Sequence, residues 1–478
     1  MESFSLILAI VVVTALAFDF TNGFHDTANA MATTISTGAL KPKVAVAMSA
    51  ALNLVGAFLS VEVANTISKG LVDEAGIRPE VIFAALVGAI LWNLLTWLVG
   101  LPSSSSHALM GGLIGATIAS AGVGAVHGDA LVTKVIIPAV AAPVVAGLAA
   151  MVATRLSYTI GRKADGKAAA KGHRAGQIAS AGLVSLAHGT NDAQKTMGVI
   201  TLALIAGGAI APGSNPPTWV ILSAGLAIAL GTYIGGWRII RTMGTGLTDL
   251  QPQQGFAAQT SAATAILASS HLGFSLSTTH VVSGSVMGAG LGRKGGVVRW
   301  STAGRMAVAW VLTLPAAALV GAGAEAVTGL GDWGTALVAV FLVASSAAIW
   351  KISRRQVVDH TNVIEPAAEE PAGVVTQAIA AVTPPPAAPA PAPTAPASAS
   401  TAPVSTDVSP AVEPLTATIP AQPTTPVIDT PVIDAPVIDA TVIDPPVIDT
   451  SVIDKPVVID PVPAPTASAS ATPPAATV

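Results

Sequence analysis

Apolar stretches without a charged residue recur along the first three quarters of this chain, each about as long as a bilayer core is thick. A helix needs roughly 20 mostly apolar residues to cross that core. The stretches cover residues 3–18, 44–61, 81–106, 108–126 and 135–154, and then lie around 196–237, 250–270, 272–292, 306–324 and 333–350. Only 10% of all residues are charged, against about 25% in soluble domains. The sequence therefore predicts an all-α integral membrane protein with about ten to twelve membrane segments.

The last quarter of the chain, residues 356–478, differs from the rest in composition. From Glu365 onward it has 12 acidic residues, one basic residue and no Phe, Trp or Tyr, and Val-Ile-Asp recurs there on a five-residue step. Such a segment buries too little apolar surface to offset the entropy of ordering it. We therefore expect a disordered acidic tail, rich in Pro and Ala, that serves as a spacer, a docking strip or a weak collector of cations.

A basic segment divides the apolar body into two halves. Residues 155–174 contain six basic residues and one acidic residue, a composition that keeps such a loop on the cytoplasmic side of a membrane. The expected organisation is a first membrane repeat (1–157), a basic cytoplasmic central loop (158–177), a second membrane repeat (178–355) and the tail. The apolar start of the chain has no basic leader, so we expect no cleaved signal peptide. The side of the termini stays open.

Two polar motifs occur twice, in the same order in both halves. Gly23-Phe-His-Asp-Thr-Ala-Asn-Ala-Met31 matches Gly189-Thr-Asn-Asp-Ala-Gln-Lys-Thr-Met197 without a gap, so that Asp26 corresponds to Asp192. Pro102-Ser-Ser-Ser-Ser-His107 matches Ser275-Leu-Ser-Thr-Thr-His280, also without a gap. Two pairs of motifs at nearly equal spacing indicate an internal duplication.

The first motif places ionisable side chains inside apolar stretches. A charged side chain in the hydrocarbon region costs about 2.5–3.5 kcal/mol on insertion scales, so it needs a polar interior or a partner. Asp26 and Asn29 are three residues apart, as are Asp192 and Lys195, so each pair shares a face if the segment is helical. These side chains could merely pin helices together, but a duplicated set that contains Asp favours a functional role.

The second motif breaks a helix and offers hydroxyl groups where the next helix begins. Pro102 ends one helix, and the serines after it precede the next. A helix N-terminus carries unsatisfied N–H donors and a partial positive charge, which suit an oxyanion. Ordinary helix caps are the alternative. Because Ser277, Thr278 and Thr279 repeat the arrangement, we expect two opposed helix starts to hold a tetrahedral anion. The histidines that follow, His107 and His280, could shuttle protons or bond to backbone carbonyls.

These residues resemble the PiT family of inorganic phosphate transporters, over a stretch from about Asp19 to Trp350. Both copies of the signature Gly-x-(His/Asn)-Asp-x-x-(Asn/Lys) are present. The resemblance implies inverted repeats, phosphate held between two re-entrant helix hairpins, and a coupling cation near the signature aspartates. It implies phosphate contacts at Ser104, Ser105, Ser106, Thr278 and Thr279. The coupling site that it implies contains Asp26, Asn29 and Asp192, with their motif neighbours His25, Asn191 and Lys195.

The sequence also departs from the pattern of sodium-coupled members of that family. Those members usually read Asn-Asp-x-x-Asn in both copies, whereas this chain has His25 in one copy and Lys195 in the other. The Lys195 ammonium would repel a bound sodium ion and could stand in for its charge. Animal members also carry glutamates where this chain has Asn53 and Gln259. Both differences resemble the bacterial, low-affinity, proton-coupled branch, in which the cargo is often a neutral metal–phosphate complex.

The sequence therefore predicts a multi-pass transporter of the cell membrane that moves inorganic phosphate with protons. A sulfate permease of the same family, sodium-coupled phosphate symport and a passive channel are the alternatives. An intramembrane enzyme would need one catalytic set rather than one copy in each half, so we expect no enzyme activity. With no cysteine and no H-E-x-x-H motif, we expect no cofactor and no resident metal site. No nucleic-acid partner is expected, and the oligomeric state stays open.

Overall fold

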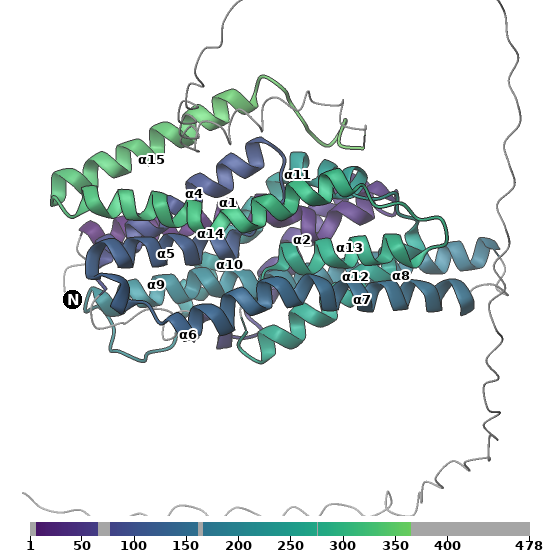
Figure 1. Cartoon of the computed structure of the whole chain (residues 1–478), viewed down its shortest axis with the longest axis horizontal. Helices are drawn as coiled ribbons and strands as arrows, with labels where there is room; N and C mark the ends of the chain where they lie inside the picture. Colours follow the sequence, from purple (N-terminus) through teal and green to yellow (C-terminus); the bar gives the residue numbers. More distant parts are fainter. Residues whose placement is uncertain (1–5, 66–76, 161–165, 275, 365–478) are drawn as a thin grey trace, which may run out of the picture. The chain divides into compact units, whose positions relative to one another are not determined.

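The computed structural model describes residues 6–65, 77–160, 166–274 and 276–364 (Figure 1). All of them belong to one compact unit, Met1–Pro386. The acidic tail that the sequence predicts lies outside the described residues from position 365 onward.

The described chain is helical and contains no strand, so the predicted all-α class is confirmed. The α-helices are α1 (Leu6–Ser36), α2 (Pro42–Gly56), α4 (Pro79–Leu98), α5 (Ser105–Ala121), α6 (Gly128–Leu131), α7 (Ile137–Ile160), α8 (Gly166–His188), α9 (Gln194–Ala206), α10 (Thr218–Ile234), α11 (Trp237–Arg241), α12 (Pro252–His271), α13 (Thr278–Gly292), α14 (Trp300–Thr328) and α15 (Asp332–Ser353). One 3₁₀ segment, η2 (Val123–Ala125), and three π segments, η3 (Val132–Ile136), η5 (Gly189–Ala193) and η6 (Thr242–Gly246), complete the described helical elements.

Helix length separates full spans from shorter pieces. In the described part, five segments are long and apolar enough to cross a membrane: α1, α4, Gly128–Ile160, α14 and α15. A sixth candidate is α10 together with Trp237–Gly246, which is bent by 61°. Helices α5 and α13 have 17 and 15 residues, which is about 25 and 22 Å at 1.5 Å per residue, less than the ~30 Å hydrocarbon core. A re-entrant hairpin requires a short helix that follows an interruption of the helical structure, and α5 and α13 are of this kind.

Two helix breaks lie in proline-containing segments, and the first of them is the break that Pro102 predicts. Helix α4 ends at Leu98 and α5 begins at Ser105, on either side of Pro102. The long apolar stretch 196–237 is divided between α9 and α10 by the Pro- and Gly-containing segment that ends at Pro217. Both interruptions contain proline, which cannot donate a backbone hydrogen bond and disfavours helix in the residue before it.

The two halves of the chain are interleaved. Helix α1 packs on α10 and α8 packs on α2, while α5 packs on α14 and α13 packs on α7. These are equivalent pairs under the duplication, and in each pair one helix comes from each half. Figure 1 shows α14 running along α5 and α7 running along α13. Each short helix is therefore covered by a long helix of the other repeat.

Glycines set the closest of these approaches. A Cβ added at Gly115 of α5 would lie 1.9 Å from the carbonyl oxygen of Ala318, and one added at Gly288 of α13 would lie 1.9 Å from that of Gly147. Gly115 and Gly288 are equivalent positions of the duplication, each the eighth residue after the histidine of its motif. Small residues at such positions let membrane helices approach backbone to backbone.

Two segments are more ordered than the sequence predicts. Where it is described, the expected central loop (158–177) is helical, because 158–160 end α7 and 166–177 begin α8. Ala and Lys, which favour helix, dominate this start of α8. Residues 356–364, expected as tail, lie against the helical body: Val363 is buried, and the Arg241 guanidinium donates to the Asn362 carbonyl oxygen at 2.7 Å.

We expect Gly115→Ala to destabilise the protein, since its Cβ would overlap the backbone of α14. Overpacking of this kind costs about 1–3 kcal/mol, and the apparent melting temperature in detergent should fall. Gly304→Ala is the matched control, because an added Cβ there meets nothing within 4 Å and alanine favours helix over glycine by about 1 kcal/mol. Equal melting temperatures for the two variants would contradict the close approach.

Candidate functional site

The two short helices begin in the same way. Ser104 is the N-cap of α5, and its hydroxyl accepts a hydrogen bond from the His107 backbone N–H at 3.1 Å. Ser277 is the N-cap of α13 and accepts from the His280 N–H at 3.3 Å. Serine is a favoured N-cap because its oxygen satisfies one of the free N–H groups of the first turn. The cap interpretation is therefore correct for these two serines, and the hydroxyls after them are free for other contacts.

Those next hydroxyls donate to the two signature aspartates. The Ser105 hydroxyl donates to Asp26 Oδ2 at 2.8 Å, and the Thr278 hydroxyl donates to Asp192 Oδ2 at 3.0 Å. Ser105 and Thr278 are equivalent under the duplication, as are Asp26 and Asp192. Each repeat thus joins its own helix start to its own aspartate by the same bond.

A second set of equivalent bonds crosses between the repeats. Asn29 Nδ2 donates to the Thr279 hydroxyl at 3.0 Å, and Lys195 Nζ donates to the Ser106 hydroxyl at 2.6 Å. Thr279 also donates to Asp26 Oδ1 at 3.4 Å. The two repeats are therefore held together by side chains that the sequence assigns to the anion and coupling sites.

The residues that precede the aspartates complete the correspondence. His25 Nδ1 lies 2.7 Å from Asp26 Oδ1, and the amide of Asn191 donates to Asp192 Oδ1 at 2.8 Å. All the predicted site residues are at most 2% exposed: Ser104, Ser105, Ser106, Thr278, Thr279, Asp26, Asn29, Asp192, Lys195, His25 and Asn191. The structure brings them together in one buried polar cluster, which we call the central cluster.

Lys195 gives the two halves of the central cluster different charges. Its ammonium forms an ion pair with Asp192 and donates to the Leu276 carbonyl oxygen at 3.2 Å. The equivalent residue in the first repeat, Asn29, is neutral. A buried ammonium needs an anionic partner and further acceptors to offset its desolvation, and Asp192, Ser106 and Leu276 supply them. The cluster therefore holds a fixed positive charge on one side only.

A histidine that the sequence analysis missed also belongs to the central cluster. His188, the last residue of α8, has Nε2 2.9 Å from Asp192 Oδ2 and 4.0 Å from Asp26 Oδ2. Its Nδ1 lies 3.2 Å from the side-chain oxygen of Asn53. His188 is four residues before Asp192, on the same helical face, and this spacing could have identified it. A search for duplicated residues passes over it, because its counterpart is Asn22.

Three of these side chains could hold a metal ion. Asp26, His188 and Asp192 each offer one ligand atom, and these atoms all lie within 4.8 Å of one another. Two carboxylates and an imidazole suit a divalent first-row metal better than sodium. The Lys195 ammonium beside Asp192 opposes any additional cation there, because like charges repel strongly in a buried site.

His107 and His280 directly follow the hydroxyl residues at the starts of α5 and α13. The rings of His107 and His280 meet edge to face, with centroids 4.8 Å apart. His280 Nδ1 lies 3.0 Å from the Ala139 carbonyl oxygen, and its ring lies 4.2 Å from that of Trp310. For His280 the structure thus shows the bond to a backbone carbonyl that the sequence left as one of two alternatives.

The two buried amides Asn53 and Gln259 have structural partners. Asn53 Nδ2 donates to the Thr232 hydroxyl at 2.8 Å, and Gln259 Nε2 donates to the Thr34 hydroxyl at 2.8 Å. These bonds join α2 to α10 and α12 to α1. An ionised glutamate could not donate such a bond, because a carboxylate only accepts.

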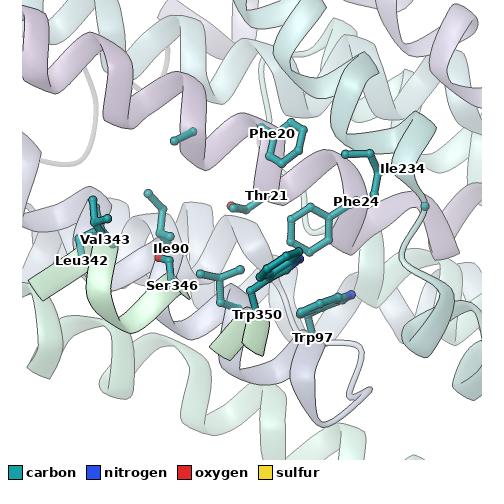
Figure 2. A pocket seen from close by; sticks show the side chains of 13 residues that line it. Phe20, Thr21, Phe24, Ile90, Trp97, Ile234, Leu342, Val343, Ser346 and Trp350 are labelled. Atoms are coloured by element: carbon teal, nitrogen blue, oxygen red, sulfur yellow. The ribbon is translucent and has the colours of Figure 1, made fainter. Parts of the chain in front are cut away.

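A separate cavity lies between α1, α4, α10 and α15 (Figure 2). Its volume is about 480 Å³, and its lining is mainly apolar and aromatic, with Phe20, Phe24, Trp97 and Trp350 among the lining residues. It contains none of the predicted anion or coupling residues and no charged side chain. Hydrocarbon suits this cavity, whereas an oxyanion does not, because it would be desolvated there without donors.

Known proteins resemble this chain over most of its helical body. Residues 22–321 match the Phosphate transporter family. The "Probable low-affinity inorganic phosphate transporter" of Mycobacterium tuberculosis (strain ATCC 25618 / H37Rv) is 58% identical over 360 residues, which are 75% of this chain and 86% of that protein. The protein of the same name from Bacillus subtilis (strain 168) is 42% identical over 324 residues, which are 67% of this chain and 97% of that protein.

A solved structure shows the same fold. "The sodium-dependent phosphate transporter" superposes with a TM-score of 0.62 at 24% sequence identity, over 68% of this chain and 100% of that chain. The family match covers both signature motifs and both short helices, and the relatives are named as transporters. Together with the membrane-length helices, this makes the chain a multi-pass protein of the cell membrane. It belongs to the phosphate transporter family, as its duplicated motifs predict.

Proposed function

We propose that this protein is a secondary transporter that carries inorganic phosphate across the cell membrane by proton symport. The observation that supports it most is the meeting of two hydroxyl-rich helix starts, Ser105–Ser106 and Thr278–Thr279, at two buried aspartates. Two opposed helix N-termini with hydroxyl donors suit a tetrahedral anion. Inverted-repeat transporters hold their substrates between such broken helices.

The aspartates favour hydrogen phosphate over sulfate. Asp26 and Asp192 are acceptors within the same cluster as the hydroxyl donors. Hydrogen phosphate carries a P–OH group that can donate to a carboxylate, whereas sulfate has only acceptors. A sulfate ion beside these carboxylates would meet repulsion without a compensating bond.

The present hydrogen bonds also give a reason for cation coupling. Ser105 and Thr278 each have one hydroxyl proton, and each gives it to a carboxylate. A bound phosphate must compete with Asp26 and Asp192 for these donors. Phosphate binding therefore takes one hydroxyl donor from each carboxylate and places a new anion beside them, and an added cation offsets that cost in a buried site.

Lys195 supports the proton rather than sodium as that cation. Its ammonium forms an ion pair with Asp192 and donates to Ser106. It stands where the duplicated motif has the neutral Asn29 in the other half. A fixed ammonium supplies a positive charge and repels a metal cation at short range. A proton can instead be taken up by a carboxylate or an imidazole.

A divalent metal that travels with phosphate is a second candidate. The ligand atoms of Asp26, His188 and Asp192, all within 4.8 Å of one another, favour it. A metal at this position would be cargo together with the phosphate, and the two positive charges would offset the anion. Addition and chelation of divalent metal during transport distinguish this from free phosphate uptake.

We expect a pH gradient to drive phosphate accumulation by purified protein in liposomes. With the outside acidic, labelled phosphate should accumulate, and an inward sodium gradient at equal pH should not drive accumulation. Excess sulfate should compete weakly, and a metal chelator should have no effect if free phosphate is the cargo. Sodium-driven accumulation that ignores the pH gradient would overturn proton symport.

We expect Lys195→Asn to reduce proton-driven uptake about tenfold or more, because loss of one partner of a buried ion pair leaves an uncompensated charge that costs about 3–5 kcal/mol. Size-exclusion chromatography and thermal unfolding in detergent should establish that the variant is folded. Lys351→Asn is the matched control, since Lys351 is exposed at the end of α15. Wild-type uptake by a folded Lys195→Asn variant would remove Lys195 from the mechanism.

We expect Ser105→Ala and Thr278→Val to raise the KM for phosphate by similar factors, because the two hydroxyls occupy equivalent places. A hydrogen bond to a charged group contributes about 1.5–3 kcal/mol, so increases on the order of tenfold or more are expected. Ser301→Ala, at an exposed position in α14, should leave KM unchanged. An effect of only one of the two hydroxyls would show that phosphate contacts one repeat alone.

A further inference from the structure

A second buried polar group lies on α1, two turns before the central cluster. Asp19 is 0% exposed, and α1 is one of the helices long enough to span the membrane. Among the described residues, no donor bonds to either of its carboxyl oxygens with normal geometry. Asp26 and Asp192, in contrast, receive hydroxyl bonds from both short helices. Asp19 therefore has a different environment from the signature aspartates.

Two asparagines with unpartnered amides lie on α1 and on α4, which packs against it. Asn22 and Asn93 are at most 1% exposed, and neither the amide nitrogen nor the amide oxygen of either one has a partner in the described part of the chain. His25 Nε2 lies 3.2 Å from the Thr96 hydroxyl. Asn22 is three residues before His25, and Asn93 is three residues before Thr96. Asn22 and Asn93 are therefore each about one turn from the His25–Thr96 contact, on two helices that pack together.

A hydroxyl from the second repeat completes this group. Thr196 on α9 is 0% exposed and lies beside the Asp19 carboxyl, and its hydroxyl has no hydrogen-bond partner of normal geometry among the described residues. We call Asp19 and Asn22 of α1, together with Asn93 and Thr196 of the two helices α4 and α9 that pack on α1, the α1 cluster. It contains a carboxyl, two amides and a hydroxyl, all buried at membrane depth.

The charged groups that act on Asp19 come from one side. They are Asp192 of η5 and Lys195 of α9, and His188 lies beside Asp192 at the end of α8. Farther along α1, His25 and Asp26 belong to the central cluster. The other two helices that pack closely on α1 carry ionisable side chains only near their ends, Glu80 on α4 and Tyr233 on α10.

The chemistry of this group selects a small cation. An ionised carboxylate without donors at membrane depth is costly, and it is stabilised by taking up a proton or binding a cation. The neutral acid both donates and accepts, and so do the amides and hydroxyl around it. Such side chains can also order a short chain of water, which is the kind of path along which a proton reaches a buried acid.

Consecutive residues of α9 connect this group to the phosphate-facing side. Lys195 donates to Ser106 and forms an ion pair with Asp192, whereas the next residue, Thr196, lies beside Asp19. A displacement of this first turn of α9 when phosphate binds would therefore act on both clusters. The charge of Asp19 would in turn act on the Lys195–Asp192 pair.

We propose that the α1 cluster is a proton-binding site distinct from the central cluster, and that Asp19 takes up the coupling proton there. The proton comes from water on the side of uptake, forms an O–H bond with the carboxylate, and returns to water on the other side when that bond breaks. No other bond changes. This inference rests on the proton symport proposed above, and adds the group that carries the proton.

Asp19→Asn tests it with two transport assays on the full-length protein in liposomes. The first measures accumulation of labelled phosphate under a pH gradient, together with proton entry reported by a pH-sensitive dye trapped inside. The second measures exchange of labelled phosphate with equal phosphate on both sides, which needs no net proton movement. We expect the variant to lose about tenfold or more of the gradient-driven accumulation and its proton entry, and to keep exchange, since one protonatable group is lost.

Two further variants and a folding measurement keep the test decisive. Asp19→Glu retains a carboxyl and should retain part of the proton-driven accumulation, and Asp332→Asn, at an exposed position of α15, should match the wild type. Because Asp19→Asn removes a buried charge, its melting temperature should equal or exceed that of the wild type.

The outcomes separate this inference from the proposed function. If the wild type is driven by protons and Asp19→Asn is driven equally well, Asp19 does not carry the proton. If a stably folded Asp19→Asn variant also loses exchange, Asp19 belongs to phosphate binding, and the separate site is wrong. If the wild type ignores the pH gradient, proton symport itself fails; a sodium requirement that Asp19→Asn abolishes would assign the α1 cluster to sodium instead.

Discussion

The arrangement of the helices around the site depends on how two buried carboxylates, Asp26 and Asp192, are stabilised. Their charge can be kept at membrane depth only if donors surround it, and those donors are hydroxyls at the starts of α5 and α13. A helix start supplies such groups because its first N–H groups are free and serine caps it. The broken hairpins, the capping serines and the aspartates are therefore joined in one arrangement.

The duplication explains how one chain builds this arrangement twice, and the two copies differ in their charged residues. Ser105–Asp26 corresponds to Thr278–Asp192, and Asn29–Thr279 corresponds to Lys195–Ser106. Identical bonds on both sides would give a cluster with equal charge in each half. Lys195 places a permanent positive charge in the second half, and His188 has no ionisable counterpart in the first. The two aspartates consequently differ in charge environment, which a carrier needs if phosphate and its companion cation occupy different places.

Much of the site could be predicted from the sequence, because all of its residues except His188 lie in a motif that occurs twice. The gap-free match of each motif with its second copy identified the hydroxyls, the aspartates and Lys195 together. Pro102 indicated the first helix break, and the match indicated the equivalent break in the second half. His188 was missed because duplication was the signal and its counterpart is not ionisable. Hydropathy could not reveal that α14 covers α5 and α7 covers α13, since any apolar helix face satisfies the same pattern. The sequence also did not predict that Val363 and Asn362 pack on the helical body. Arg241 holds this segment through a backbone carbonyl, and composition does not reveal such a contact.

The pairing of α5 with α14 has a consequence for how the protein is made. Roughly 180 residues separate the end of α5 from the start of α14, which takes about 10 to 40 s of synthesis at 5–20 residues per second. During that time the face of α5 that contains Gly111 and Gly115, on which the backbone of α14 packs in the complete protein, is not yet covered by α14. Helix α13, by contrast, emerges after its partner α7 is already in place. The two repeats therefore differ in the order in which their packing partners are synthesised, even where their final structures match. Helix α5 cannot complete its packing until the second half of the chain has been made.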